Sequence, residues 1–370
     1  MTANRPQLRI LVARPDRLGD VILSTPVLDV LKSHYPGSHL TFLVRDPVVS
    51  VVKGLRSVDQ IMVYDPEGRH KGVGGFFRLM EEVRKNNFQI GVVLQSQLRI
   101  AAALFGAGVP HRVGSLAKPH SFLFYNRGSQ QHRSQVEMHE ADYNLQLLRT
   151  LGIRTGTRKV PTAVHFSSEP GGAREFAQKW LAEKGWKADA GTKLVVVHPG
   201  MGGSALNWPE AHYIELIRLL CKEGHQVLVT GGPGEGLLLS RIQDELAHSS
   251  ARAIFYGGAG AGAVDQLAAL MSFASVVVAP STGPLHLAVA LGIPVVTFYP
   301  PVRVQSAIRW GPYVSEQSKA SILVPEVYCG QDFHCIGSLC NYHPCMKSMT
   351  VGQTLEQVHL QLGQLEKHVT

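Results

Sequence analysis

Short runs of β-branched residues alternate with longer amphipathic stretches along most of this 370-residue chain. Apolar residues are nearly continuous in the short runs and recur at helical spacing in the longer stretches. This alternation predicts parallel sheets covered by helices on both faces, which is the α/β class. The pattern occurs over residues 10–151 and again over residues 194–299, which predicts two similar domains. A cleft is expected between the carboxyl ends of their strands, where ligands of such sheets bind.

The individual elements follow from the same two periods. In the first half we expect strands at residues 10–12, 40–44, 60–63 and 89–94 and helices at residues 18–34, 76–85 and 139–151. In the second half we expect strands at residues 194–198, 226–230, 275–279 and 294–299 and helices at residues 208–222, 237–247, 264–273 and 284–291. Residues 111–133 follow neither period and are expected to be irregular. A polar helix at 172–184, a hinge at 185–192 and a last helix at 355–365 complete the prediction.

The balance of charged residues indicates the kind of partner. Lys and Arg number 36 against 28 Asp and Glu, a net charge of +8, so anionic partners are favoured. The basic residues are spread along the chain, and no zinc-finger or RNA-recognition signature accompanies them, so nucleic acid is not an expected partner. Acidic small substrates or an anionic membrane surface agree better with this charge.

The sequence predicts a protein of the cytoplasm. The apolar stretch at residues 10–13 is too short for a signal peptide, and Arg14 and Asp16 follow it at once. The most apolar region, residues 268–302, is interrupted repeatedly by Pro and Gly, so we expect buried strands, turns and a helix there, not a membrane span. Five cysteines, with Cys221 standing alone, indicate a reducing compartment.

Two strand-to-helix loops carry candidate chemistry. In the first loop, residues 14–21, Gly19 lets the backbone approach a ligand, and the Asp20 carboxylate can act as a general base. The alternative is that Asp20 only complements the helix N-terminus. In the second loop, residues 280–287, Ser281 or Thr282 can cap a helix whose first backbone amides can bind a pyrophosphate. The alternative there is an ordinary capped core helix with His286 as a satisfied polar residue.

A third loop, residues 198–204, contains three glycines in four positions, Gly200, Gly202 and Gly203 among residues 200–203. Bare amides of this kind form anion-binding nests. The loop is not a Walker loop, because no Gly-Lys-Ser/Thr follows it. The loop at residues 231–236 also departs from the dinucleotide fingerprint, which argues against a nicotinamide-dependent dehydrogenase.

Four cysteines gather near the C-terminus, Cys329, Cys335, Cys340 and Cys345. Four thiols could bind zinc. Their spacing is C-x5-C-x4-C-x4-C without a C-x2-C knuckle, so it favours reduced thiols that pack an irregular lobe, or a labile disulfide. No metal and no cofactor are therefore expected.

Three ordered motifs together resemble glycosyltransferase family 9, the bacterial lipopolysaccharide heptosyltransferases. They are RLGDV at 17–21 with TPVL at 25–28, HPG at 198–200 with NWP at 207–209, and STGPLHLA at 281–288 with ALGIPVV at 290–296. The resemblance implies a GT-B architecture of two Rossmann-like domains. It implies an acceptor-binding domain at 1–185, a nucleotide-sugar-binding domain at 186–349 with the Cys-rich segment 329–345, and a C-terminal helix at 350–370 that packs on the first domain.

The resemblance also implies an inverting displacement without a bound metal, and the sequence contains no Asp-x-Asp motif. Asp20 falls on the family's catalytic base. The donor residues expected from the motifs and their surroundings are Gly200, Gly202, Gly203, Ser204, Ser281, Thr282, Gly283, His286 and Arg303. The acceptor residues expected are Arg17, Gly19, Arg112 and Arg127. The expected partners are a nucleotide-diphosphate sugar, an anionic glycolipid and the inner membrane surface, contacted peripherally by a monomer.

Two departures from the family keep alternatives open. Leu206 stands where many members have a Lys that meets the donor phosphates, and Ser281 stands where studied heptosyltransferases have Asp. Arg303 or Arg17 could replace the missing cation, and the sugar could differ from ADP-heptose. A relative that binds nucleotide sugar or glycan without turnover, and a GT-B epimerase or hydrolase, are the alternatives.

Overall fold

The computed structural model describes residues 7–155, 172–186, 193–258, 260, 262–314, 316 and 319–366. The chain divides into two compact units, Met1–Arg133 with Met138–Thr162, and Ser134–Glu137 with Ala163–Thr370. Of the described residues, no helix is both long enough and apolar enough to cross a bilayer.

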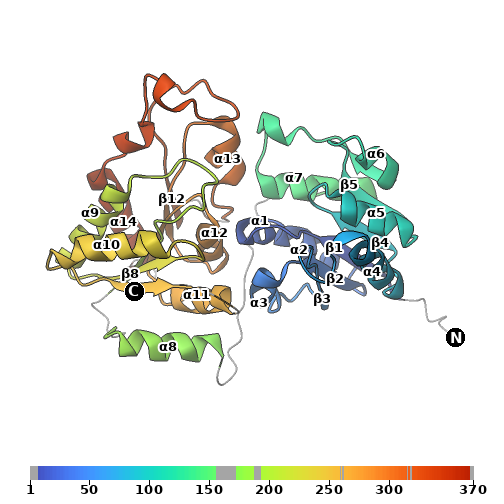
Figure 1. The fold of residues 1–370 in the computed structure, drawn as a ribbon, viewed down its shortest axis with the longest axis horizontal. Helices are drawn as coiled ribbons and strands as arrows, with labels where there is room; N and C mark the ends of the chain where they lie inside the picture. The colour runs from blue at the N-terminus through green and yellow to red at the C-terminus, as the bar shows by residue number, and fades with distance from the viewer. Residues whose placement is uncertain are drawn as a thin grey trace. The chain divides into compact units, whose positions relative to one another are not determined.

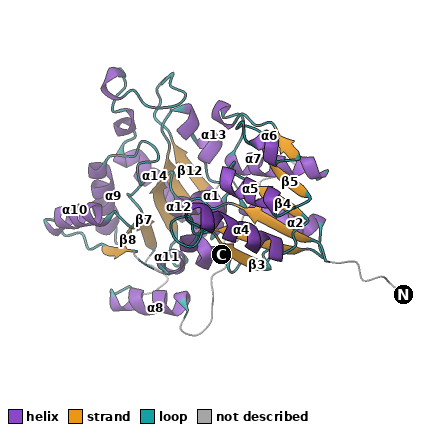
Figure 2. Cartoon of the chain, turned by 45° about the vertical axis from the view of Figure 1, so that its right-hand side comes forward, coloured by secondary structure: helices purple, strands orange, loops and turns teal. Residues whose placement is uncertain are grey.

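The first unit is built on a six-stranded parallel sheet (Figures 1 and 2). Its strands are β1 (Arg9–Ala13), β2 (His39–Val44), β3 (Gln60–Val63), β4 (Ile90–Val93), β5 (His111–Ser115) and β6 (Arg127–Ser129). They lie in the order β3-β2-β1-β4-β5-β6, with Leu11 of β1 level with Thr41 on one side and Gly91 on the other. The order reverses direction between β1 and β4, where open α/β sheets bind their ligands.

The second unit repeats this topology. Its strands are β7 (Leu194–Val197), β8 (Gln226–Gly231), β9 (Ile254–Gly257), β10 (Val276–Pro280), β11 (Val295–Phe298) and β12 (Ala320–Leu323). The order β12-β11-β10-β7-β8-β9 is the first sheet's order with every strand number raised by six and read from the other edge. The switch point therefore lies between β7 and β10. The prediction of two Rossmann-like α/β domains is confirmed.

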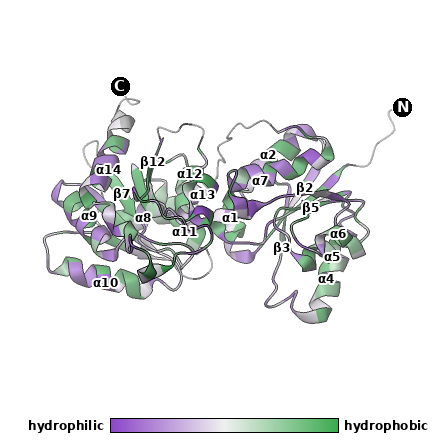
Figure 3. Cartoon of the chain, turned by 90° about the horizontal axis from the view of Figure 1, so that it is seen from above, coloured by the Kyte–Doolittle hydropathy of each residue, from purple (hydrophilic) through white to green (hydrophobic). Residues whose placement is uncertain are grey.

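Helices cover the sheets. The first unit contains α1 (Leu18–Ile22), α2 (Thr25–His34), α3 (Val49–Val52), α4 (Gly72–Lys85), α5 (Leu98–Gly106), α6 (Ser121–Phe124) and α7 (Glu140–Gln146). The second contains α8 (Ala173–Glu183), α9 (Glu210–Lys222), α10 (Gly236–Ala247), α11 (Ala263–Met271), α12 (Gly283–Ala290), α13 (Ala307–Trp310) and α14 (Val351–Glu366). Single helices such as α9 and α10 carry both apolar and polar residues, as the two colours in Figure 3 show.

Burial on both faces explains why the central strands read as continuous apolar runs. In β1, Ile10 and Val12 belong to the core on one face of the sheet, and Leu11 and Ala13 to the core on the other. All of them are completely buried. Side chains alternate along a strand, so a strand covered on both sides has no position that faces solvent.

The structure corrects three expectations about the elements. The helix predicted at 18–34 is two helices, because Pro26 in the first turn of α2 has no N–H to continue a helix from α1. The stretch 111–133 is not irregular throughout, since it forms β5, α6 and β6. Sequence periodicity also missed α5, β9 and β12. Residues 187–192 of the predicted hinge lie outside the described residues.

Two predicted domain assignments are also wrong. Helix α8 was placed in the first domain, but it packs against α11 of the second unit (Figure 1). Its Trp180 also lies edge-on to Tyr256 of β9, at 5.5 Å between ring centroids. Helix α14 was expected to pack on the first domain. Its Val358 and Leu362 instead join the core of the second unit, because the apolar face of α14 lies on that unit's sheet and on α9.

Candidate active-site loops

The loop after β1 brings three acidic side chains around one buried arginine. Arg14 follows the last residue of β1 and is 1% exposed. Its guanidinium lies 2.8 Å from Oδ2 of Asp16, 2.7 Å from Oδ1 of Asp20 and 3.3 Å from Oε1 of Glu140. Burial alone would lower the pKa of this guanidinium, but the three carboxylates more than offset burial and raise it. Arg14 is therefore a fixed cation that orients the acids at this sheet edge.

Helix α7 supplies the far side of this cluster. Glu140 in its first turn is 1% exposed and pairs with Arg14 and with Arg133. Asn144, one turn later, accepts a hydrogen bond from the Arg14 Nη1 at 3.3 Å and donates one to Ser24 Oγ at 3.2 Å. Because every charge here has an opposite partner, the cluster can be buried without an isolated ion.

Asp20 and Asp16 are the members of this cluster that retain some exposure. The Asp20 side chain is 24% exposed and sits in the first turn of α1, as predicted. The Asp16 side chain is 16% exposed. Burial raises the pKa of Asp16 to about 6, against the opposing effect of Arg14. Asp20 is thus an acidic group held in place by a cation on one side and reachable on the other, as a general base requires.

The predicted acceptor residues have different surroundings. Arg17 is exposed at the N-cap of α1, and Gly19 is buried beneath it. Arg127 is exposed on the edge strand β6. The Arg112 guanidinium donates to the backbone carbonyls of Phe124 at 2.7 Å and Val109 at 2.6 Å, so it ties its own loop together.

In the second unit, the loop after β7 is shaped around a carboxylate. A side chain on Gly200 would place its Cβ 2.1 Å from the carboxyl group of Glu235, so the end of that glutamate would have to move to make room for it. The Glu235 Oε2 accepts a hydrogen bond from the Gly232 N–H at 2.7 Å. Gly202 and Gly203 have φ of +60° and +73°, in the left-handed region that favours glycine. Ser204 is close by, its Oγ donating to the Met201 carbonyl at 3.2 Å.

His198 is buried behind this loop. Its Nδ1 lies 2.9 Å from Thr230 Oγ1, and its Nε2 lies 3.7 Å from Glu235 Oε2. Burial lowers the pKa of His198 to about 4, although Glu235 opposes the shift. The imidazole is therefore neutral at pH 7 and serves as a hydrogen-bonding support for the loop.

A cavity of about 610 Å³ opens over these loops. It is lined by the predicted residues Gly200, Gly202 and Gly203 and by residues that follow β8, among them Glu235 and Arg241. Its size is in the range of small-molecule sites. Ser204 and the residues at the start of α12 do not line this cavity.

Helix α12 begins at the end of β10, directly across the switch point from β7. Thr282 is its N-cap in extended conformation, and no side chain caps the first amides. Ser281, Thr282 and Gly283 are all partly exposed. His286 is 4% exposed and belongs to the buried side of the helix. Backbone amides at a helix N-terminus of this kind can bind an anionic oxygen, and His286 is a core residue of the same helix.

The predicted replacement cation, Arg303, lies after β11. Its side chain is 51% exposed, and its Nη1 is 4.0 Å from Asp332 Oδ1. Leu206, at the position of the family's Lys, packs against the second unit's core. The structure therefore gives Leu206 an apolar surrounding and leaves Arg303 as the accessible cation of this loop.

Sequence reasoning missed Arg14, Glu140 and Glu235 as site residues. Arg14 and Asp16 stood within the first motif, so the pairing of charges there was a usable signal. Glu140 lies 126 residues from Arg14 along the chain, and no local pattern connects them. The role of Glu235 could not be predicted, because the glycine beside it, Gly200, already fits the pattern of an anion-binding loop.

Comparison with known proteins identifies the family. The sequence profile of glycosyltransferase family 9 (heptosyltransferase) matches residues 76–343. A Haemophilus influenzae protein, named as a glycosyltransferase without a stated substrate, is 32% identical over 82% of this chain and 86% of its own. The lipooligosaccharide heptosyltransferase 2 of Haemophilus ducreyi is 24% identical over 78% of this chain and 81% of its own.

Solved structures confirm the GT-B class. The family 9 glycosyl transferase of Veillonella parvula superposes with a TM-score of 0.81 at 22% identity, covering 96% of this chain and 98% of that one. The ADP-heptose lps heptosyltransferase II of E. coli gives 0.75 at 20% identity, covering 97% and 100%. With the two repeated sheets, the motif loops at both switch points and the profile match, this chain belongs to glycosyltransferase family 9, the heptosyltransferase family, and is a glycosyltransferase.

Proposed function

We propose that this glycosyltransferase moves a heptose from ADP-heptose to an anionic acceptor that resembles a lipopolysaccharide core, with inversion and without a catalytic metal. The observation that carries the proposal is the Asp20 carboxylate held 2.7 Å from the buried Arg14 at the switch point of the first sheet. The names of the H. ducreyi and E. coli relatives support the sugar and the acceptor class.

In the proposed reaction, Asp20 takes the proton from an acceptor hydroxyl. The hydroxyl oxygen forms a bond to the anomeric carbon on the face opposite the diphosphate. The bond from that carbon to the diphosphate oxygen breaks, and the leaving diphosphate keeps the electron pair. Arg14 orients Asp20, because its guanidinium pairs with the carboxylate at 2.7 Å.

The leaving diphosphate gains about one negative charge, and a helix N-terminus supplies only about half a charge. We propose that the amides after Thr282 and in the loop at 200–204 share this charge with Arg303, which stands in for the Lys absent at Leu206. Ser281, Thr282, Gly283, Gly200, Gly202, Gly203 and Ser204 are the proposed donor residues, with His286 as support from the core.

For the acceptor we propose contacts from Arg17, from the backbone at Gly19 and from Arg127. Both arginines are exposed, and guanidinium groups suit the acidic sugars of such cores. Arg112 remains a proposed acceptor residue. Its Nε and Nη1 donate to two backbone carbonyls, and we propose that its Nη2 contacts the acceptor. The net charge of +8 supports a proposed peripheral contact of a monomer with the inner membrane surface on the cytoplasmic side.

The test combines binding and turnover. ADP-, GDP- and UDP-sugars are screened by thermal shift, because a ligand of the folded state raises its melting temperature. The sugar that binds is then incubated with and without a heptose-bearing glycolipid, and the linkage of the product is determined by NMR. Transfer that needs the glycolipid and inverts the anomeric configuration supports the proposal. Binding without turnover indicates the impaired relative, and hydrolysis or epimerisation without acceptor indicates the other GT-B chemistry.

A further inference from the structure

The cysteine-rich segment, residues 328–345, has a defined path but little apolar core of its own. Within it the structure contains only 3₁₀ turns, at Gly337–Leu339 and starting at Cys345. Its large apolar side chains point outward, with Tyr328 86%, Leu339 83% and Phe333 63% exposed. A segment that buries so little apolar surface needs a cross-link or a metal to hold it.

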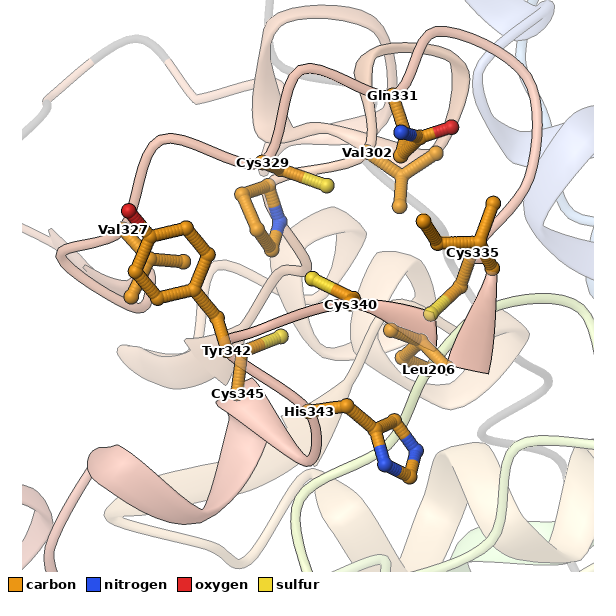
Figure 4. A pocket seen from close by; sticks show the side chains of 12 residues that line it. Leu206, Val302, Val327, Cys329, Gln331, Cys335, Cys340, Tyr342, His343 and Cys345 are labelled. Carbon is orange, nitrogen blue, oxygen red and sulfur yellow. The ribbon is translucent and has the colours of Figure 1, made fainter. Parts of the chain in front are cut away.

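The four cysteines of this segment line one cavity. Cys329, Cys335, Cys340 and Cys345 are all partly buried and none forms a disulfide. Figure 4 shows their sulfur atoms turned into the same space beneath Val302 and beside Leu206. The cavity volume is about 10 Å³, which is room for a single water-sized occupant and excludes an organic ligand.

The backbone turns tightly beside two of these cysteines, and one amide contacts a sulfur. The Gly337 N–H donates to the Cys335 Sγ at 3.3 Å. Gly337 has a φ of +61° and Gly330, next to Cys329, a φ of +67°, so glycine lets the chain turn tightly beside each cysteine. Hydrogen bonds from backbone amides stabilise the thiolate form that binds metals.

We propose that Cys329, Cys335, Cys340 and Cys345 bind one metal ion of the class that prefers four sulfur ligands. Zinc and iron are the biological ions that proteins most often hold in a tetrahedral set of four thiolates. On binding, the four S–H protons pass to solvent and four metal–sulfur bonds form. The site is structural, because four protein ligands leave no open position for a substrate.

The ion must draw the four thiols together. Among the described residues, the group whose ligand atoms already lie within 4.8 Å of one another is Glu223, His225 and His359, on the surface beside α14. There the His359 Nε2 and the Glu223 Oε2 already pair at 2.8 Å, and both side chains are about a third to a half exposed. That group is the competing metal site, and the experiment below separates the two.

The proposed ion would also fix the loop that carries Arg303. Pro301 and Val302 line the thiol cavity. The next residues bond to the segment through Arg303 N–H to the Gln331 carbonyl at 3.1 Å and Val304 N–H to the Asp332 carbonyl at 2.9 Å. This consequence rests on the proposed role of Arg303 in donor binding, whereas the metal site itself does not.

The experiment measures metal content in the full chain purified from cells supplied with zinc and iron. We expect about one ion per chain in the wild type and at least a tenfold lower content in Cys335→Ser and Cys340→Ser. Cys221→Ser is the matched control, because Cys221 lies in α9 outside the cavity, and it should keep the ion. Elemental analysis identifies zinc or iron, and either one supports the proposal.

A second measurement does not depend on the variants folding. Wild-type protein stripped by a chelator under reducing conditions is titrated with Co²⁺, which should give the visible absorption of tetrahedral cobalt thiolate at one equivalent. A thiol reagent should then modify one cysteine in the metal-bound protein, compared with five in the metal-free protein. No metal, no cobalt spectrum and five reactive thiols would overturn the proposal. So would an ion that survives in both cysteine variants and is lost in His359→Ala.

Discussion

The two units share one sheet topology but place opposite chemistry at its switch point. The first ends β1 with Arg14 inside a ring of three carboxylates, whereas the second ends β7 and β10 with glycine-rich loops and an uncapped helix N-terminus. The first switch point therefore presents carboxylates paired with a cation, and the second presents N–H groups of the kind that bind anions. The strand order therefore determines where a site lies, and the residues just after the strands determine its chemistry.

The treatment of buried polar groups differs in the same way. The first unit buries charges in matched pairs, as Arg14 with Glu140 shows. The second unit buries a neutral imidazole, since burial lowers the pKa of His198. Ion pairs therefore orient the acids of the first unit, whereas a neutral imidazole and the Glu235 carboxylate support the loops of the second.

Removing the central cation should have the largest effect. Arg14→Met leaves Asp16 and Asp20 without their cation and Glu140 with Arg133 alone. Breaking a buried ion pair costs about 3–5 kcal/mol. We expect the free energy of unfolding to fall by that amount in urea denaturation. Arg17→Met, in the same loop but exposed, is the control and should unfold as the wild type does. If both variants had the same urea midpoint, burial of the carboxylates would not depend on Arg14.

The second unit should instead be sensitive to acid through His198. Its pKa is about 4 when folded and the ordinary value is 6.5, so the unfolded chain binds the proton first. The stability contribution is present above pH 6.5 and is lost as pH falls toward 4, with about 2 kcal/mol lost between pH 7 and pH 5. Unfolding measured at both pH values in wild type and His198→Gln isolates this loss. An equal pH slope in the two proteins would refute it.

A smaller effect should follow from filling the space at Gly200. Gly200→Ala places a Cβ 2.1 Å from the Glu235 carboxyl group. The Glu235 side chain must swing away and give up its hydrogen bond with the Gly232 N–H, which removes a support of the loops whose amides we assign to the donor. Donor affinity measured by calorimetry should fall about tenfold, or about 1.4 kcal/mol. Gly363→Ala, where a Cβ meets nothing within 4 Å, should leave donor affinity unchanged. Unchanged affinity in Gly200→Ala would separate the donor from this loop.

Much of the fold could be predicted because central strands and amphipathic helices have strong periods. Strands β5 and β6 could not, since their residues are polar and glycine-rich near the edge of the sheet. The helices α8 and α14 were predicted but assigned to the wrong unit. An apolar face shows that a helix packs against something, but it does not show which surface that is.

The candidate site shows the same limit. Asp20, Gly200 and Thr282 could be predicted as site residues because each lies in a loop that follows a strand. Glu140 and Glu235 could not be found, since their contacts with Arg14 and Gly200 are created by folding. The spacing of the four cysteines favoured simple packing, and only their shared cavity points to a metal.

We assign the base to the first unit and the diphosphate site to the second, and one substitution can test this assignment. Asp20→Asn tests it most directly, with sugar transfer and donor affinity measured on the same preparation. Loss of a general base should slow transfer at least about 100-fold, roughly 3 kcal/mol of barrier, while the dissociation constant of the donor stays within a factor of about two. Near-normal transfer, or a donor that no longer binds, would contradict this division.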